Sequence, residues 1–222
     1  MTSPAVEDYL KAIYQLSGQG TAASTSALAE RLGVAAGSVT GMLKRLAEQG
    51  LVEHTRYYGA RLTPAGEAHA LRTIRHHRVL ELFLVEVLGY SWDRVHDEAE
   101  RLEHAVSEEL IDRMAGVLGE PGQDPHGAPI PTASGELHEV ALPSLLEIDI
   151  GVPAVLRQVP DDDSAALRYF ATLELVPGAH VAVLERAPFE GPVRLRVGMR
   201  ECAIGTRLAS KVRVEPLAAG VP

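Results

Sequence analysis

The sequence predicts a mainly α-helical protein that carries a small β domain towards its C-terminal end. Over roughly the first half of the chain, apolar residues recur three and four positions apart, which is the spacing of one face of an α-helix. A stretch rich in Pro, Gly and Ser follows at residues 119–143 and is typical of a linker. Beyond it, apolar residues alternate with polar ones, which predicts short β-strands.

Length and composition favour a protein of two or three small domains. The chain has 222 residues, of which 46% are hydrophobic, an ordinary share for globular domains. No apolar run reaches the ~18 residues that a membrane-spanning helix needs, and the first residues do not resemble a signal peptide. The single cysteine, Cys202, excludes a disulfide framework within one chain. We therefore expect a cytoplasmic protein with no membrane partner.

Charge is distributed unevenly along the chain. The net charge of −9 taken alone argues against a nucleic-acid binder. However, residues 1–75 hold 8 Lys and Arg against 6 Asp and Glu, a net charge of +2, whereas the remaining residues hold 13 against 24, a net charge of −11. This asymmetry indicates an N-terminal part that tolerates phosphates and an acidic body whose repulsion a bound cation would relieve.

The first expected helix begins at Ser3-Pro4 and ends before the glycines of residues 18–20. A hydroxyl followed by proline at the first helical position is a favourable helix start. Asp8 lies in the first part of this helix, where an acid usually serves the helix dipole. A ligand from this helix would also connect it to a metal cluster elsewhere in the chain.

A helix-turn-helix is expected next. Thr25 or Ser26 caps a short helix at residues 27–32, and Gly33-Val34 forms a tight turn. A longer helix follows at residues 36–49 and is closed by Gly50. Two helices joined by a short glycine-containing turn are typical of this DNA-binding motif.

The outward side of the second helix carries side chains suited to DNA. Hydroxyl and basic groups there can meet phosphates and base edges in a major groove. The residues on this side are Ser38, Thr40, Gly41, Lys44 and Arg45.

A basic, aromatic hairpin follows the two helices. Residues 51–54 and 60–63 are expected to pair around a tip that ends at Gly59, and Arg56, Tyr57 and Arg61 are candidates for contacts with backbone phosphates. The series therefore predicts a winged helix-turn-helix that binds double-stranded DNA. The alternative is a helical hairpin used for protein contacts.

The middle of the chain is predicted to be helical and strongly apolar. A long helix is expected from Thr63-Pro64 to Leu88, a second helix is expected to be capped by Ser91, and a third begins at Ser107. The long helix carries more apolar residues than one exposed helix could leave unpaired. This indicates a dimerisation region, and the alternative is a core within one chain.

The second of these helices contains the most informative pattern. In a helix, His96, Glu100, Glu103 and His104 share one broad stripe, and His77 and Glu81 lie one turn apart upstream. Imidazoles and carboxylates that face one another from neighbouring helices suit Mn, Fe, Co or Zn. The alternative is a solvated helix face on which nearby arginines pair with the acids.

The C-terminal part is predicted to form about five short strands of a small barrel. Ahead of these strands lies Pro160-Asp-Asp-Asp-Ser164, which is expected to open a short helix. Three acids at such a place usually form a capped, solvated turn, but they could also offer an oxygen ligand to a metal.

Along its whole length the chain resembles the diphtheria-toxin-repressor and manganese-transport-repressor family of metal-dependent transcriptional regulators. The resemblance rests on a collinear set of motifs. These are Glu7–Tyr14, Ser38–Thr40, Gly50–Val52, Leu62–Gly66, His77–Glu81, Val95–His104, Pro125–Pro131 and, for the C-terminal FeoA/SH3-like domain, Leu173–Gly178.

The resemblance implies the domains and the metal ligands. The domains would be a winged helix-turn-helix at residues 1–63, a helical metal-binding and dimerisation domain at 64–119, a linker at 120–146 and a FeoA/SH3-like domain at 147–222. A primary metal site would use Asp8, Glu100, Glu103 and His104. His77, Glu81 and His96 would hold a second site, completed from the C-terminal domain by acids near residues 161–163, for which Asp162 and Asp163 are the candidates.

The choice of metal follows from two further comparisons with the family. Iron-type members carry Met and Cys where this chain has Asp8 and Glu100, and these harder carboxylate ligands favour Mn²⁺. Manganese-type members usually have Glu where this chain has Lys11, which argues against a closely paired two-metal centre. Mn²⁺ is therefore expected, with Fe²⁺ as the alternative.

The resulting prediction is a homodimeric regulator, not an enzyme, whose operator binding depends on metal. Metal would join the first helix to the dimerisation helices and so fix the spacing of the two recognition helices. One alternative is a metallohydrolase, because His and carboxylate clusters also activate water. Another is a metal-buffering or adaptor protein that uses the barrel for contacts.

Overall fold

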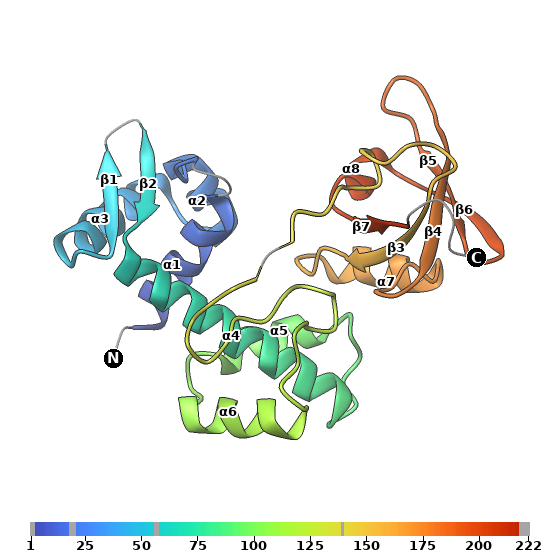
Figure 1. The fold of residues 1–222 in the computed structure, drawn as a ribbon. Helices are drawn as coiled ribbons and strands as arrows, with labels where there is room; N and C mark the ends of the chain where they lie inside the picture. Colours follow the sequence, from blue (N-terminus) through green and yellow to red (C-terminus); the bar gives the residue numbers. More distant parts are fainter. Residues whose placement is uncertain (1–2, 18–20, 56–57, 139, 218–222) are drawn as a thin grey trace. The chain divides into compact units, whose positions relative to one another are not determined.

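The computed structural model describes residues 3–17, 21–55, 58–138 and 140–217. The chain divides into two compact units (Figure 1). Unit 1 comprises residues 1–77, 101–112 and 131–137, and unit 2 comprises residues 78–100, 113–130 and 138–222. The predicted fold class is confirmed, because helices dominate the first part of the chain and a small antiparallel sheet forms the last part.

Unit 1 begins with three helices and a two-stranded hairpin. Helix α1 spans Pro4–Leu16, α2 spans Thr25–Leu32 and α3 spans Ala36–Glu48. Strand β1, Val52–Thr55, pairs antiparallel with β2, Gly59–Leu62. The turn between α2 and α3 depends on Gly33, whose φ of 65° lies in the left-handed region that glycine adopts readily. This is the predicted winged helix-turn-helix.

The cap of α2 differs from the prediction by one residue. Ser24, not Thr25 or Ser26, precedes the helix, and its hydroxyl accepts a hydrogen bond from the backbone N–H of Ala27. Three adjacent hydroxyl residues satisfy the sequence rule equally well, so only the backbone geometry distinguishes them.

Helix α4, Pro64–Glu86, follows the hairpin and packs closely against it at its first turn. A Cβ atom built on Gly66 would lie 2.0 Å from the carbonyl oxygen of Leu51, so only glycine fits there. The core of this part of unit 1 is formed mainly by apolar residues of α1, α3 and the hairpin. Its fully buried members include Leu10, Ile13, Leu28, Val39, Leu43, Leu46 and Ala60.

Two shorter helices complete the middle of the chain. Helix α5 spans Val95–Leu102 and α6 spans Glu108–Val117. The predicted cap at Ser91 is wrong, because residues 92–94 form a turn and the helix begins only at Val95. The ring of Trp92 stacks on that of His126 and its carbonyl accepts a hydrogen bond from this histidine, so tertiary contacts hold the turn out of the helix.

The C-terminal part of unit 2 is a five-stranded antiparallel sheet with strand order β6-β5-β4-β3-β7. Strand β3 spans Pro153–Gln158, β4 His180–Arg186, β5 Val193–Val197, β6 Arg200–Ile204 and β7 Arg213–Pro216. Helix α7, Ser164–Thr172, and the short α8, Thr206–Ala209, contribute Phe170 and Ala209 to its core.

Part of the segment predicted as a linker is packed inside unit 2. Asp124, His126, Ala128 and Ile130 are buried. At Gly127, φ is 89° and an added Cβ would lie 1.8 Å from the carbonyl oxygen of Arg157. The Pro- and Gly-rich composition therefore reflects tight packing at this place as well as turns.

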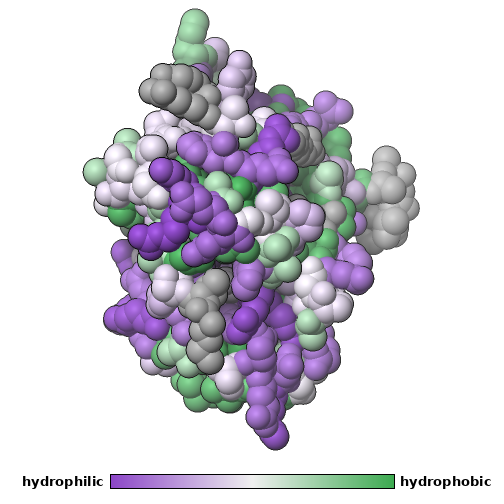
Figure 2. Space-filling view, turned by 90° about the vertical axis from the view of Figure 1, so that its left-hand side faces the viewer, coloured by the Kyte–Doolittle hydropathy of each residue, from purple (hydrophilic) through white to green (hydrophobic). Residues whose placement is uncertain are grey.

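Hydrophilic and hydrophobic residues are interspersed on the face drawn in Figure 2. Among the described residues, no helix is both long and apolar enough to cross a bilayer.

Candidate metal centre and nucleic-acid interface

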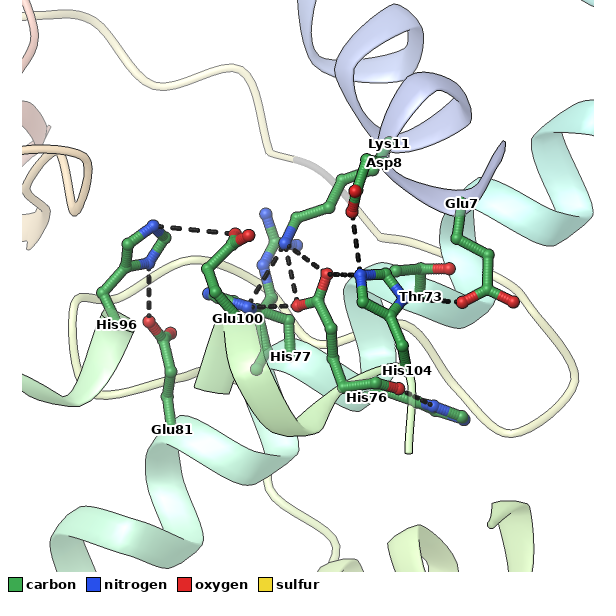
Figure 3. Close-up of polar contacts among 12 residues, drawn as sticks. Glu7, Asp8, Lys11, Thr73, His76, His77, Glu81, His96, Glu100 and His104 are labelled. Atoms are coloured by element: carbon green, nitrogen blue, oxygen red, sulfur yellow. Dashed lines mark hydrogen bonds and ion pairs between the residues drawn. The ribbon is translucent and has the colours of Figure 1, made fainter. Parts of the chain in front are cut away.

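His104 lies where the segment after α5 meets the first turns of α1. Its Nδ1 donates to Glu7 Oε2 at 2.6 Å and its Nε2 donates to Asp8 Oδ1 at 2.8 Å (Figure 3). Burial lowers the pKa of His104, but the hydrogen bond to Glu7 and the charges of Asp8 and Glu103 outweigh it, so the pKa is raised above its usual range. Without metal, the imidazolium form is thus favoured here.

Glu103 is buried, with 1% of its surface exposed. His77 Nδ1 donates to its Oε2 at 2.5 Å, and Lys11 Nζ lies 2.9 Å from both of its oxygens. His104 Nε2 lies 3.5 Å from its Oε1. Glu103 therefore connects α1, α4 and the segment after α5.

Asp8, Glu103 and His104 together can hold a metal ion. Each offers one ligand atom, and these atoms lie within 4.8 Å of one another. Two carboxylates and one imidazole suit Mn²⁺, Fe²⁺ or Zn²⁺. All three residues belong to unit 1, so this part of the predicted primary site is assembled within one compact unit.

Glu100, predicted as the fourth ligand, lies one helical turn before Glu103. Its Oε1 is 3.7 Å from His96 Nε2, and its side chain is 41% exposed. In unit 2 the structure therefore places Glu100 beside the histidine that was predicted for the second site.

A second group of ligand atoms lies in unit 2. Glu81, Asp124, His126 and Asp161 each offer an atom within 4.8 Å of the others. His96 shares this neighbourhood, because its Nδ1 donates to Glu81 Oε1 at 3.1 Å. His77, predicted as a partner of Glu81 and His96, lies one turn before Glu81 on α4, and its Nδ1 donates to Glu103 Oε2. Its part in the second site stays a prediction.

The second group has unsatisfied polar atoms that a metal ion would fit. Among the described residues, His126 Nδ1 and Asp124 Oδ2 are buried and have no hydrogen-bond partner. Burial and the charge of Glu81 raise the pKa of Asp124 to about 7. Burial lowers the pKa of His126, but the negative charge of Glu81, 3.7 Å from Nδ1, raises it to about 9. Arg78 Nε, 3.6 Å from Asp124 Oδ2, offsets part of the negative charge of these buried acids, and a bound metal ion would offset more of it.

The acids of residues 161–163 have three different environments. Asp161 joins the second group, whereas Asp162 Oδ2 lies 3.4 Å from Lys211 Nζ. Asp163 caps α7, and its Oδ1 accepts hydrogen bonds from the backbone N–H groups of Ala165 and Ala166. The structure thus brings Asp161 to the group, in place of the candidates Asp162 and Asp163.

Sequence reasoning missed Asp124 and His126 as site residues. They stand in a Pro- and Gly-rich stretch without periodicity, so no helical spacing relates them to Glu81. The available signal was the motif Pro125–Pro131, which carries the family resemblance, contains His126 and directly follows Asp124.

The predicted DNA-facing residues of α3 are exposed. Ser38, Thr40, Gly41, Lys44 and Arg45 all lie on its solvent side, opposite the buried Val39, Leu43 and Leu46. The hydroxyl of Thr40 donates to the carbonyl of Ala36 at 3.0 Å. Arg61 is exposed on β2, and Arg56 and Tyr57 lie outside the described residues.

Three family models match the chain. Residues 1–60 match the N-terminal DNA binding domain of the iron dependent repressors, residues 63–132 match their metal binding and dimerisation domain, and residues 144–216 match the FeoA domain.

Known proteins resemble the chain over nearly its whole length. The iron-dependent repressor IdeR of Mycobacterium leprae is 31% identical over 221 residues, which cover 94% of this chain and 96% of that protein. The diphtheria toxin repressor of Corynebacterium diphtheriae is 29% identical over 222 residues, which cover 95% and 96%.

Solved structures resemble it equally widely. A manganese-dependent transcriptional repressor in complex with manganese has a TM-score of 0.88 at 39% identity, covering 96% of this chain and 100% of that one. The manganese regulator SloR has a TM-score of 0.81 at 31% identity, covering 97% and 100%.

Proposed function

The chain belongs to the iron-dependent repressor family, and we propose that it is a metal-dependent transcriptional repressor whose operator binding is controlled through Asp8, Glu103 and His104. One observation supports this control most directly. His104 bonds two acids of α1, the first helix of the DNA-binding part, and stands beside Glu103. A change of charge at this point therefore acts directly on the helix that packs against the helix-turn-helix.

The proposed control works through the positions of these side chains. A bound divalent cation would supply the charge that holds two carboxylates and one imidazole together. Asp8 would then be held against the segment that carries Glu103 and His104, and α1 would be fixed with it. By linkage, the operator would tighten metal binding by the same factor by which metal tightens operator binding.

The domain limits and the DNA contacts are part of the proposal. Residues 1–63 would bind DNA, with Ser38, Thr40, Lys44 and Arg45 in a major groove and the wing, Arg61 included, on phosphates. Residues 64–119 would form a homodimer, 120–146 a connection, and 147–222 the FeoA domain. A two-fold dimer needs half-sites about 34–36 Å apart or a multiple of this. Such a repressor would act in the cytoplasm.

Manganese is the proposed metal. Asp8 and Glu103 are hard oxygen ligands, and among the described residues no sulfur ligand belongs to either group. The relatives include both manganese-dependent and iron-dependent repressors, so Fe²⁺ is the competing candidate. Glu81, Asp124, His126 and Asp161, with His96 beside them, would hold a second ion.

The proposal can be tested by fluorescence anisotropy on duplex DNA from the promoter region of the protein's own gene neighbourhood. Wild type, His104→Ala and the exposed control His180→Ala would be titrated with Mn²⁺ and, anaerobically, with Fe²⁺. We expect wild type and the control to bind only with metal, and His104→Ala to need at least tenfold more metal. Equal binding by wild type in the presence of a chelator would contradict metal control.

A further inference from the structure

Lys11 is a buried cation in contact with a proposed metal ligand. It lies on α1 one turn after Asp8, and 7% of its surface is exposed. Its Nζ lies 2.9 Å from both oxygens of Glu103 and 3.3 Å from His77 Nδ1. Figure 3 shows its side chain reaching from α1 toward His77.

The burial of this ammonium group requires its partner. A charge removed from water is costly unless an opposite charge and hydrogen bonds compensate it. Glu103, itself buried, is that opposite charge. In the metal-free protein, Lys11 therefore neutralises Glu103 and ties α1 to it without any ion.

The same carboxylate is needed for metal binding. Glu103 Oε1 faces His104 at 3.5 Å and also accepts a hydrogen bond from Lys11 at 2.9 Å. A divalent cation beside Asp8 and His104 would thus share Glu103 with an ammonium group that is already in place. The two positive charges repel each other, and Lys11 withdraws charge from the ligand oxygens.

We propose that Lys11 is an internal counter-cation that competes with the metal ion for Glu103 and thereby sets the metal affinity of the Asp8–Glu103–His104 site. This inference rests on the proposed function, because it takes these three residues as metal ligands. It goes further, because it holds that Lys11, which is not a ligand, sets the metal concentration at which the site fills. Without Lys11, the site would fill at lower metal concentrations.

The test compares Lys11→Met, Lys11→Gln and Lys11→Arg with wild type in the full chain. Mn²⁺ affinity would be measured from the electron paramagnetic resonance signal of free Mn²⁺, and thermal midpoints would be recorded with and without Mn²⁺. We expect Lys11→Met and Lys11→Gln to bind Mn²⁺ at least tenfold more tightly, which equals about 1.4 kcal/mol. Their metal-free midpoints should fall and should recover when Mn²⁺ is added.

The two neutral variants and the arginine variant together distinguish the effect of losing the charge from the effect of disturbing the structure. Lys11→Gln keeps a hydrogen-bond donor for Glu103 if Lys11→Met does not fold without metal. Lys11→Arg keeps the charge and should retain the affinity of wild type. Unchanged or weaker Mn²⁺ binding in both neutral variants would overturn the proposal.

His104→Ala distinguishes this failure from a failure of the proposed function. If His104→Ala binds Mn²⁺ as wild type does, the ligand assignment is wrong and the inference falls with it. If His104→Ala weakens binding while the neutral Lys11 variants do not strengthen it, only the role of Lys11 is wrong.

Discussion

The ring of His126 stacks on that of Trp92, with their centroids 5.4 Å apart and their planes at 29°. His126 Nε2 donates to the Trp92 carbonyl at 2.8 Å, so this nitrogen carries the hydrogen. When the ring is neutral, the available electron pair is therefore on Nδ1, which lies 3.7 Å from Glu81 Oε2. The contact with Trp92 prepares His126 to bind a cation in the second group through Nδ1.

The stability of the metal-free protein should fall as the pH rises. The pKa of Asp124 is raised to about 7 and that of His126 to about 9, so both groups hold protons more tightly in the folded chain than in the unfolded one. The stability that each protonated group contributes is fully present below the pKa of that group in the unfolded chain. It is lost as the pH rises through the pKa of the group in the folded chain. Urea unfolding should show the loss of the Asp124 contribution between about pH 4 and about pH 7 and of the His126 contribution between about pH 6.5 and about pH 9.

Asp124→Asn provides the control for this pH dependence. The amide can keep the two hydrogen bonds that Asp124 Oδ1 accepts from the N–H groups of His126 and Ala128, but it carries no charge. The decrease between about pH 4 and about pH 7 should disappear, and stabilisation by Mn²⁺ should shrink. If the metal-free wild type has the same free energy of unfolding at both ends of the pH range, the pH dependence assigned to Asp124 and His126 is contradicted.

The three adjacent acids should respond differently to substitution. Asp161→Asn should weaken metal binding by the second group, because Asp161 belongs to it. Asp163→Ala should cost about 0.5–2 kcal/mol through loss of the α7 cap and leave metal affinity unchanged. Asp162→Asn, which removes an exposed ion pair, should change the free energy of unfolding by at most about 1 kcal/mol. Isothermal titration and urea unfolding of all three variants would check this ordering.

Gly41→Ala should stabilise the fold and weaken DNA binding. Gly41 lies inside α3, and an added Cβ would meet nothing within 4 Å. Alanine in a helix interior is favoured over glycine by about 0.5–1 kcal/mol. If the backbone of α3 approaches the operator closely at Gly41, operator affinity should fall while the free energy of unfolding rises.

Gly66→Ala is the matched comparison. There the added Cβ would lie 2.0 Å from the Leu51 carbonyl oxygen, so this variant should be destabilised. Operator affinity that is unchanged in Gly41→Ala would exclude a close approach at that position.

Lys44→Ala should weaken operator binding with a defined salt signature. One lost phosphate contact lowers the slope of log affinity against log salt by about 0.9. Lys211→Ala, in which an exposed lysine of the C-terminal part is removed, should leave the slope unchanged. A slope that is equal in all three proteins would show that Lys44 does not neutralise a phosphate.

The sequence predicted most of the fold, because its signals were local. The glycines at positions 33, 50 and 89 ended turns and helices as expected, and each has a positive φ. The family resemblance was confirmed by the domain matches and relatives. The helix start at Val95 was not predictable, because the stacking of Trp92 on His126 is a contact between distant residues.

The candidate sites were predictable where a helix orders the ligands. His77 and Glu81 were singled out because they lie one helical turn apart, and Glu103 and His104 because they continue the stripe of His96 and Glu100; their roles as ligands stay predictions. Asp161 could not be chosen among three adjacent acids, because their different roles depend on Lys211, on the N–H groups of α7 and on the buried group itself. Nor does spacing reveal that Lys11 is buried, since lysine is usually exposed.

Besides offering Asp161, the FeoA part positions two further members of the second group through the close approach at Gly127. The N–H of Val159, just after β3, donates to the carbonyl of His126 at 3.0 Å, and the backbone at Gly127 lies directly against that of Arg157. The end of strand β3 therefore fixes the position of the loop that carries Asp124 and His126. A side chain introduced at position 127 would push that loop away from the sheet and displace Asp124 and His126, the proposed ligands.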